Sequence, residues 1–216
     1  MRARGSSSRS KRPSTSRWKN ARPRLRRAMP GDLSLLGKIR LLIEPLEARE
    51  LVAAAVEVSR PLIERNGHRL ALELADEPIA LVGDRARLTQ VLSNLLKNAA
   101  NYPPPRGTIT FAQQQEGDEA VFRVRDTGIG IPVNMLDRMF DMFIQVENSL
   151  DRAQGGLGIG LTLVRELVNM HQGTIRITSE GVGRGCEFVV RLPCSQSPSE
   201  SDLSRECGRE PAIAEG

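Results

Sequence analysis

Two asparagines spaced four residues apart are the first side chains in this sequence that suggest chemistry. Asn94 and Asn98 belong to the segment NLLKNAANYPPP at residues 94–105. Apolar residues recur at helical spacing in and before this segment, and they predict an amphipathic helix that begins near Asp84. The spacing of four places both amides on one side of that helix, and the prolines end it. Because amide oxygens ligate hard cations, the two side chains predict a site that holds a cation.

Three glycine-rich clusters fall at the ends of other predicted elements. Asp126–Gly130 (DTGIG) ends a strand, where the glycines let the backbone approach a ligand closely. Its carboxylate can accept a hydrogen bond from an exocyclic amine such as that of adenine. Gly155–Gly160 (GGLGIG) leads into a helix, whose first N–H groups can bind phosphate. Gly181–Gly185 (GVGRG) forms a turn before the last strand. Each cluster alone is weak evidence, and DTGIG by itself is equally compatible with an ordinary turn.

Several classes of protein are excluded by what the sequence lacks. No GxxxxGK[ST] segment is present, which excludes the phosphate-loop class of nucleotide hydrolases. Gly155–Gly160 follows no strand and opens no βαβ unit, so it is not a dinucleotide fingerprint. With only two histidines, neither a zinc site nor a Ser–His–Asp arrangement is expected. We predict that His68 and His171 are structural. No apolar run reaches the roughly 18 residues of a membrane-spanning helix, so we expect no membrane segment.

Charge divides the chain into a basic arm and an acidic remainder. Residues 1–31 hold 11 of the 31 Lys and Arg residues and no Asp or Glu, which leaves a net charge of −6 elsewhere. We interpret residues 1–33 as a disordered basic tail, 34–194 as one folded domain and 195–216 as a disordered polar tail. The basic tail could bind nucleic acid or anionic lipid, with Trp18 as a stacking residue. A solvated tail or an imperfect gene start is the favoured interpretation, so we expect no specific nucleic acid. The three cysteines fit no disulfide or metal spacing and indicate a cytoplasmic location.

Hydrophobic periodicity predicts an α+β fold, a two-layer sandwich with helices on one face of a mixed, mostly antiparallel sheet. We expect Asp84 to cap the N-terminus of its helix and Gly173 to cap the C-terminus of the last helix. The predicted strands are Lys38–Glu44 (ended by Pro45), His68–Ala75, Ile79–Gly83, Gly107–Gln114, Ala120–Asp126, Thr174–Ser179 and Cys186–Leu192. The predicted helices are Glu47–Asn66, the helix from Asp84, a short one at Val133–Phe140, and Gly158–His171.

The clusters, in this order, resemble the ATP-binding catalytic domain of sensor histidine kinases. This domain belongs to the Bergerat-type superfamily, which also includes DNA gyrase, heat-shock chaperone 90 and mismatch-repair ATPases. The segment NLLKNAANYPPP resembles the N box, and DTGIG resembles the first glycine box. Met139–Phe143 resembles the F box, GGLGIGL the second glycine box and GVGRGCEF the terminal glycine turn. The likeness covers about residues 38–193 and is nearest to kinases that often also carry a receiver domain.

The resemblance implies a role for each matching residue. Asn98 would ligate Mg²⁺ on the triphosphate, Asn94 would support the phosphate end, and Asp126 would accept from the adenine amine. The resemblance also implies that Phe140 and Phe143 anchor a lid over about residues 144–156. Tyr102, Gly128, Gly130 and Ile131 are expected around the base, and Arg152, Gly156, Leu157, Gly158, Gly160 and Leu161 around the phosphates.

Three positions depart from the family pattern. Asn101 stands where the family often has Lys, Arg or His, which weakens one expected phosphate contact. Gln172 replaces a common glycine, to which we attach no consequence. Cys186 stands where serine is frequent, and it is expected to have no chemical role.

The resemblance also bears on the type of reaction. Members of the superfamily that hydrolyse ATP carry a glutamate four residues before the metal asparagine, whereas this chain has Asn94, which cannot take a proton from water at neutral pH. The implied activity is therefore phosphoryl transfer to a histidine. No histidine precedes His68, so we expect the acceptor on a dimerisation domain that is either separate or missing from a truncated kinase, with a response regulator receiver domain further along the relay. The alternative is an inactive remnant or an ATP-responsive regulatory module, and a nucleic-acid binder is least supported.

Overall fold

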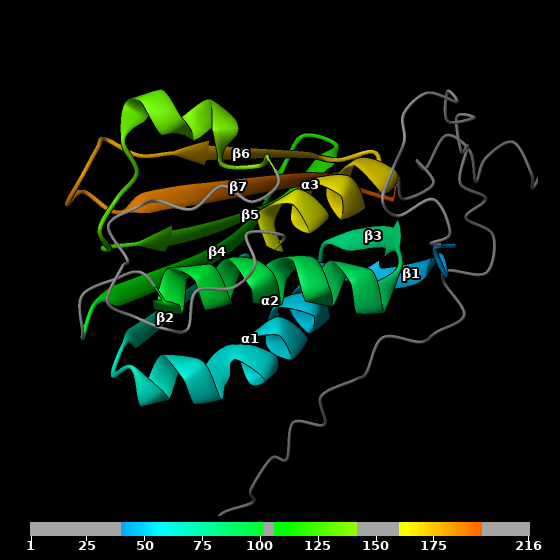
Figure 1. The fold of residues 1–216 in the computed structure, drawn as a ribbon. Helices are drawn as coiled ribbons and strands as arrows, with labels where there is room; N and C mark the ends of the chain where they lie inside the picture. Colours follow the sequence, from blue (N-terminus) through cyan, green and yellow to red (C-terminus); the bar gives the residue numbers. More distant parts are fainter. Residues whose placement is uncertain (1–39, 102–105, 142–159, 196–216) are drawn as a thin grey trace, which may run out of the picture.

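The protein is a two-layer α+β sandwich, which confirms the predicted fold class. A computed structural model describes residues 40–101, 106–141 and 160–195. A five-stranded sheet forms one layer, and the helices α1, α2 and α3 lie together on one of its faces (Figure 1). The helices are α1 (Ala48–Arg65), α2 (Arg85–Asn101) and α3 (Gly160–Met170), with a short 3₁₀ helix η2 (Val133–Arg138). The strands are β1 (Glu44–Glu47), β2 (Arg69–Leu74), β3 (Ala80–Gly83), β4 (Thr108–Glu116), β5 (Glu119–Asp126), β6 (Thr174–Thr178) and β7 (Cys186–Pro193).

The five-stranded sheet has the order β2-β4-β5-β7-β6. Only β2 and β4 run parallel, with Arg69 opposite Thr108, while the other neighbours are antiparallel. The predicted hairpin is confirmed: β4 and β5 are joined at Gly117, whose φ of +60° suits glycine in a tight turn. Because β5 lies at the centre of the sheet, the residue at its end, Asp126, is held between two neighbouring strands.

An aliphatic core fills the space between the two layers. Helix α2 packs between α1 and α3, so that most of its apolar side chains are inaccessible to solvent. Leu92, Leu95 and Leu96 are at most 1% exposed and face the inner side of the sheet, where Phe111 and Phe122 are fully buried. Burial of such side chains stabilises the fold by about 2 kcal/mol each. The core thus fixes α2, which carries the two asparagines, firmly against the sheet.

The prediction of a first strand at Lys38–Glu44 was wrong. β1 begins at Glu44 and pairs antiparallel with β3 in a separate two-stranded sheet, where Pro45 lies opposite Val82 rather than ending the strand. A proline is tolerated there because β1 has a partner strand on one side only among the described residues. The described residues just before β1 are exposed instead, and Leu42 is 79% accessible. Its apolar alternation therefore did not indicate a buried face.

The predicted cap at the end of α3 also needs correction. The left-handed residue is Gln172, with a φ of +60°, and not Gly173. The Gln172 N–H bonds to the Asn169 carbonyl, and the Gly173 N–H bonds to the Val168 carbonyl at 3.0 Å, which is a Schellman arrangement. Glycine is needed at position 173 for another reason, since a Cβ there would lie 2.4 Å from the Arg191 carbonyl oxygen. The departure at Gln172 therefore does have a consequence.

We expect Gln172→Gly to stabilise the fold by about 0.5–1 kcal/mol. Glycine removes the cost of holding a residue with a Cβ in the left-handed conformation, and this gain is partly offset because glycine adds freedom to the unfolded chain. Urea unfolding of the two proteins measures this difference. Gln172→Ala is the matched control, since it keeps the Cβ and should bring no gain. A Gly variant that is less stable than the parent would contradict the assignment of strain to this position.

Candidate nucleotide site

Asp126 lies at the end of β5 and is the buried carboxylate of the candidate site. It is 5% exposed. One carboxylate oxygen, Oδ1, accepts a hydrogen bond from the Gly128 N–H at 2.8 Å, and the other, Oδ2, accepts from the Cys186 thiol at 2.9 Å. Burial raises the pKa of Asp126 above its usual range, although both hydrogen bonds oppose that shift. A buried acceptor with remaining lone-pair capacity is suited to a ligand N–H donor.

Cys186 has a structural role that the sequence did not indicate, because it donates a hydrogen bond to Asp126. It pairs with Asp126 across β5 and β7, and its thiol reaches the carboxylate because both side chains point to the helix side of the sheet. Burial, together with the charge of Asp126, raises the pKa of the Cys186 thiol well above its usual range. The thiol therefore stays protonated and acts as a hydrogen-bond donor to Asp126. The sequence signal that could have pointed to this role was that the family often has serine, another hydrogen-bond donor, at this position.

The first glycine cluster and the terminal glycine turn are packed backbone to backbone. Gly183 and Gly185 donate to the carbonyls of Ile129 and Gly128 at 2.7 and 3.0 Å. Gly130 has a φ of +66°, and a Cβ there would lie 2.0 Å from the Gly181 carbonyl oxygen. A side chain is therefore excluded at Gly130 by the close approach of the two segments, and at Gly185, where a Cβ would lie 2.0 Å from the Asp126 carbonyl oxygen. The two glycine clusters, more than fifty residues apart in sequence, form one unit beside Asp126.

Ser179 joins this unit and was not identified from the sequence. Its hydroxyl donates to the Gly185 carbonyl at 2.7 Å and accepts from the Ile131 N–H at 3.0 Å. It also accepts from the Gly181 N–H at 3.2 Å. Ile131, one of the residues predicted around the base, is 6% exposed and is thereby tied to the terminal glycine turn.

The F-box phenylalanine is anchored to α3. Phe140 is 8% exposed, and its carbonyl accepts a hydrogen bond from the Thr162 hydroxyl at 2.9 Å. The Arg165 guanidinium lies 5.8 Å from the centre of the Phe140 ring and 4.0 Å from the Asp141 carboxylate. Thr162 and Arg165 are thus two further residues that sequence reasoning did not single out. They couple the start of α3 to the described part of the F box, which ends at Asp141.

The two asparagines of α2 are placed as the sequence predicts, one helical turn apart. Asn94 and Asn98 are both partly exposed, and neither side chain forms a hydrogen bond with another residue that the structure describes. Their amide groups are therefore available to a ligand. Asp84 caps the start of this helix as predicted, because its Oδ1 accepts from the Arg87 N–H at 3.0 Å.

His68 ties the C-terminal end of α2 to the end of the sheet where Asp126 lies. Its Nε2 donates to the Ala100 carbonyl at 2.9 Å, and the Asn66 amide donates to the same carbonyl at 2.7 Å. The next residue, Arg69, begins β2 opposite Thr108, and Thr108 in turn accepts from the Thr127 N–H beside Asp126. The C-terminal end of α2 and the end of β5, where Asp126 stands, are therefore on the same side of the molecule, and Figure 1 shows these two ends of the ribbon together.

His171 makes contacts of the kind expected for a structural histidine. Its Nδ1 donates to the Leu167 carbonyl at 2.7 Å, and its Nε2 accepts from the Asp84 N–H at 3.0 Å. Both ring nitrogens are used, and the ring joins the end of α3 to the start of α2. Gly83 leaves room for the ring, since a Cβ there would lie 2.9 Å from His171.

Part of the predicted site lies outside the described residues. Leu161 is partly exposed in the first turn of α3, and Gly160 is the exposed first residue of that helix. The residues outside the described ranges are Tyr102, Phe143, Arg152, Gly156, Leu157 and Gly158.

The donor set fits magnesium bound through a nucleotide rather than a metal held by the protein alone. Within the described ranges, no group of three or more His, Cys, Asp or Glu side chains could hold a metal ion. The free amide oxygens of α2 are instead the type of neutral oxygen ligand that adds one or two bonds to an ion whose other ligands are phosphates and water. In the described part of the chain, no helix combines the length and apolar character of a membrane span.

The fold is similar to that of solved histidine-kinase catalytic domains. The mycobacterial sensor histidine kinase MprB matches with a TM-score of 0.62 and 25% identity, over 70% of this chain and 98% of that chain. Full-length ShkA in complex with AMPPNP matches with a TM-score of 0.64 and 25% identity, over 73% of this chain and 32% of its own.

Sequence relatives agree with the structural ones. The sensor histidine kinase RcsC of Escherichia coli is 39% identical over 183 residues, which are 82% of this chain and 19% of RcsC. The circadian input-output histidine kinase CikA of Synechococcus elongatus is 37% identical over 166 residues, which are 75% of this chain and 22% of CikA. This chain thus spans about a fifth of the length of either relative.

The family description "Histidine kinase-, DNA gyrase B-, and HSP90-like ATPase" matches residues 83–196, and the chain belongs to this family. The matched segment contains α2, Asp126 and both glycine clusters of the packed unit. The resemblance inferred from the motifs is therefore confirmed, and the domain is an ATP-binding domain of the histidine-kinase type.

Proposed function

We propose that this domain transfers the γ-phosphoryl group of ATP to a histidine on a separate dimerisation domain. The observation that carries the proposal is the pairing of a buried acceptor, Asp126, with two free amides on α2 and no carboxylate at position 94. This combination suits a site that binds ATP but does not activate water. The proposal places the chain in a two-component phosphorelay.

Asp126 selects the base in this proposal. Its buried carboxylate accepts a hydrogen bond from the exocyclic amine of adenine, which a keto base could not donate. The thiol of Cys186 and the N–H of Gly128 hold the carboxylate in place for that contact. Tyr102, Gly130 and Ile131 complete the surroundings of the base.

Asn98 and Asn94 act at the triphosphate end. Asn98 holds Mg²⁺ through its amide oxygen, and Asn94 orients a phosphate from one helical turn away. When bound, Mg²⁺ neutralises charge that develops on the phosphate oxygens during transfer. The proposed phosphate contacts are the N–H groups of Gly156, Gly158 and Gly160, together with Leu157, Leu161 and Arg152. Phe140 and Phe143 are proposed to anchor the segment that covers the nucleotide.

The identity of residue 94 decides the fate of the phosphoryl group. An amide has no basic lone pair at neutral pH, so Asn94 cannot deprotonate an attacking water. Transfer then requires a nucleophile that needs no strong base, and a neutral histidine imidazole is one. We therefore propose a dimerisation domain bearing this histidine as the first partner and a response regulator receiver domain as the second. We also propose a cytoplasmic location and a folded domain that extends over residues 34–194.

The proposal is tested by mixing the protein with radiolabelled ATP and an isolated dimerisation domain from a histidine kinase. Acid-labile, base-stable label on that domain is the expected result. Nucleotide binding without label on any acceptor would contradict phosphotransfer and favour the alternative, an ATP-responsive regulatory module. Absence of nucleotide binding would overturn both.

We expect Asn98→Asp to weaken Mg·ATP binding by about tenfold or more, because the new negative charge faces the phosphates. Aspartate has nearly the same shape as asparagine, so the helix should remain intact. Isothermal titration in the presence of Mg²⁺ measures the effect. Asn169→Asp, the same chemical change at an exposed position of α3, is the control and should bind normally. Loss of the far-UV circular dichroism signal in Asn98→Asp alone would instead indicate a structural role.

A further inference from the structure

Strand β2 ends the five-stranded sheet and carries an unused set of backbone hydrogen-bonding groups. The Arg69 N–H bonds to Gly107 at 3.0 Å and the Ala75 N–H to Gln113 at 2.9 Å, both on the β4 side. Backbone groups alternate along a strand, so those of Leu70, Leu72 and Leu74 point away from the sheet. Among the described residues, no strand pairs with this edge. Such an edge can accept another strand.

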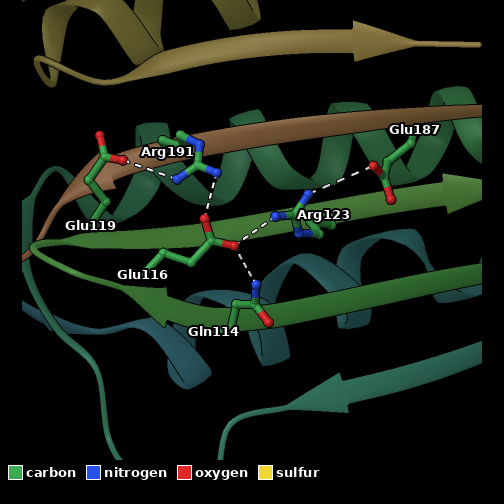
Figure 2. Close-up of polar contacts among 6 residues, drawn as sticks. All are labelled: Gln114, Glu116, Glu119, Arg123, Glu187 and Arg191. Carbon is green, nitrogen blue, oxygen red and sulfur yellow. Dashed lines mark hydrogen bonds and ion pairs between the residues drawn. The ribbon is translucent and has the colours of Figure 1, made fainter.

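The charges on β2 differ from those on the interior strands. On β4, β5 and β7 the open face carries a connected set of ion pairs, in which Glu116 contacts both Arg123 and Arg191 (Figure 2). The two arginine partners lower the pKa of Glu116 to about 2, Arg123 having the larger effect. Arg69 and Glu73 of β2 are exposed on the same face, yet neither forms an ion pair with another described residue.

Arg69 and Glu73 cannot neutralise each other within one strand. They are four residues apart on the same face, so their Cα atoms are separated by about 13 Å. The other side of the strand is also incompletely covered, since Leu72 is 48% exposed on the helix side of the sheet. The strand therefore presents one cation, one anion and an accessible leucine along a free edge.

We propose that β2 pairs with β2 of a second copy of this chain, antiparallel and centred on Ala71. In this register Leu70 of one copy lies opposite Leu72 of the other, and their outward backbone groups form two hydrogen-bonded pairs around the two-fold axis. Arg69 of each copy then lies opposite Glu73 of the other, in directly facing positions on the open face. The two sheets become one continuous sheet. This inference is independent of the proposed function.

The charges select this register over its neighbours. Centring the axis on Leu70 places Arg69 opposite Ala71, and centring it on Leu72 places Arg69 opposite Ala75. Centring it on Glu73 brings two carboxylates together, which is destabilising. Only the axis at Ala71 pairs every charge with its opposite. Backbone direction permits all four registers, so complementarity of the side chains makes the choice.

The opposite edge of the sheet is protected against such pairing. Strand β6 reads Thr-Ile-Arg-Ile-Thr, with Arg176 exposed at its centre and no acidic residue in the strand. A second copy of β6 placed beside it brings two arginines close together without a counter-charge. A central charge on an edge strand is a common means of preventing association. The two edges of the sheet therefore have different properties.

The test uses the full chain in sedimentation velocity over a series of protein concentrations. The parent protein is expected to form a dimer as its concentration rises. In a dimer of Arg69→Glu, or of Glu73→Arg, both facing pairs at positions 69 and 73 consist of like charges. Each variant alone should therefore associate at least about tenfold more weakly than the parent. An equimolar mixture of the two variants should dimerise like the parent, because every facing pair in the heterodimer is then attractive. Circular dichroism spectra and thermal midpoints check that both variants are folded.

A cross-link tests the register itself. In a background with the three cysteines changed to serine, Ala71→Cys should form an intermolecular disulfide under mild oxidation, since two residues on the axis face each other closely. Ala112→Cys, on the interior strand β4, is the control and should not. A parent protein that stays monomeric at every concentration overturns the proposal. So does parent-like dimerisation of both charge variants alone, which would place the interface elsewhere.

Discussion

Asp126→Asn is expected to weaken ATP binding by about 100-fold while leaving the fold intact. The variant keeps the shape of the side chain but replaces a charged acceptor with an amide, whose NH₂ group cannot accept from adenine. Fluorescence titration with a labelled ATP analogue, or calorimetry, measures the change. Asp76→Asn, at an exposed carboxylate in the connection between β2 and β3, is the matched control and should bind normally.

Base selectivity gives a second measure of the same contact. The parent protein should prefer ATP to inosine triphosphate, which has a keto oxygen in place of the exocyclic amine. In Asp126→Asn that preference should disappear, because the amide can donate to the keto oxygen. Unchanged ATP affinity in the variant would show that Asp126 does not bind the base.

The raised pKa of Asp126 also makes the stability of the fold and its affinity for ATP depend on pH. Burial disfavours the ionised carboxylate, so the folded state holds its proton to a higher pH than the unfolded state does. Stability therefore decreases as the pH rises from the ordinary pKa of an aspartate through the raised value. Asp126→Asn removes this cost, so the variant should equal or exceed the parent in stability at neutral pH and show no such gain in acid. ATP affinity of the parent should fall as the pH drops through the raised pKa.

Gly185→Ala is expected to destabilise the fold by about 3 kcal/mol or more. The residue has a φ of +69°, and a Cβ there would lie 2.0 Å from the Asp126 carbonyl oxygen. The left-handed conformation costs about 1–2 kcal/mol, and relieving the overlap requires movement of the backbone of a central strand. Because that backbone belongs to Asp126, ATP binding should be lost as well.

Gly183→Ala separates the steric cost from the conformational one. Gly183 belongs to the same turn and has a φ of +78°, but no atom lies within 4 Å of a Cβ built there. Its substitution should therefore cost only about 1–2 kcal/mol. Chemical denaturation of both variants gives the comparison. Equal losses would indicate that the two glycine segments are less closely packed than the hydrogen bonds between them imply.

The sequence by itself predicted most of the elements and the family. Helix α2 with its two asparagines, the hairpin of β4 and β5 and the cap at Asp84 follow from spacings of two to four residues. These features depend on hydrogen bonds and apolar faces that form within a short segment, so the residues of that segment are sufficient to predict them. The order of the glycine clusters was sufficient to predict the family, which the match over residues 83–196 confirms.

Local pattern failed where a residue's role depends on a distant segment. The apolar alternation before Glu44 predicted a strand, but among the described residues no strand pairs with residues 40–43. Gln172 carries the left-handed conformation, whereas glycine is required at position 173 because the backbone of Arg191 occupies the space beside it. Neither outcome can be deduced from the residues adjacent in sequence.

Only the tertiary structure decided how the site is assembled. Asp126 meets Cys186 because β5 and β7 become neighbours, and Ser179 joins two glycine segments that lie far apart along the chain. The position of β2 at the edge of the sheet, which leaves Arg69 and Glu73 without an ion-pair partner in the part of the chain that the structure describes, is likewise a consequence of strand order. The physical reason is that the spacing of residues encodes which segments form strands, whereas their order is set by the packing of the whole core.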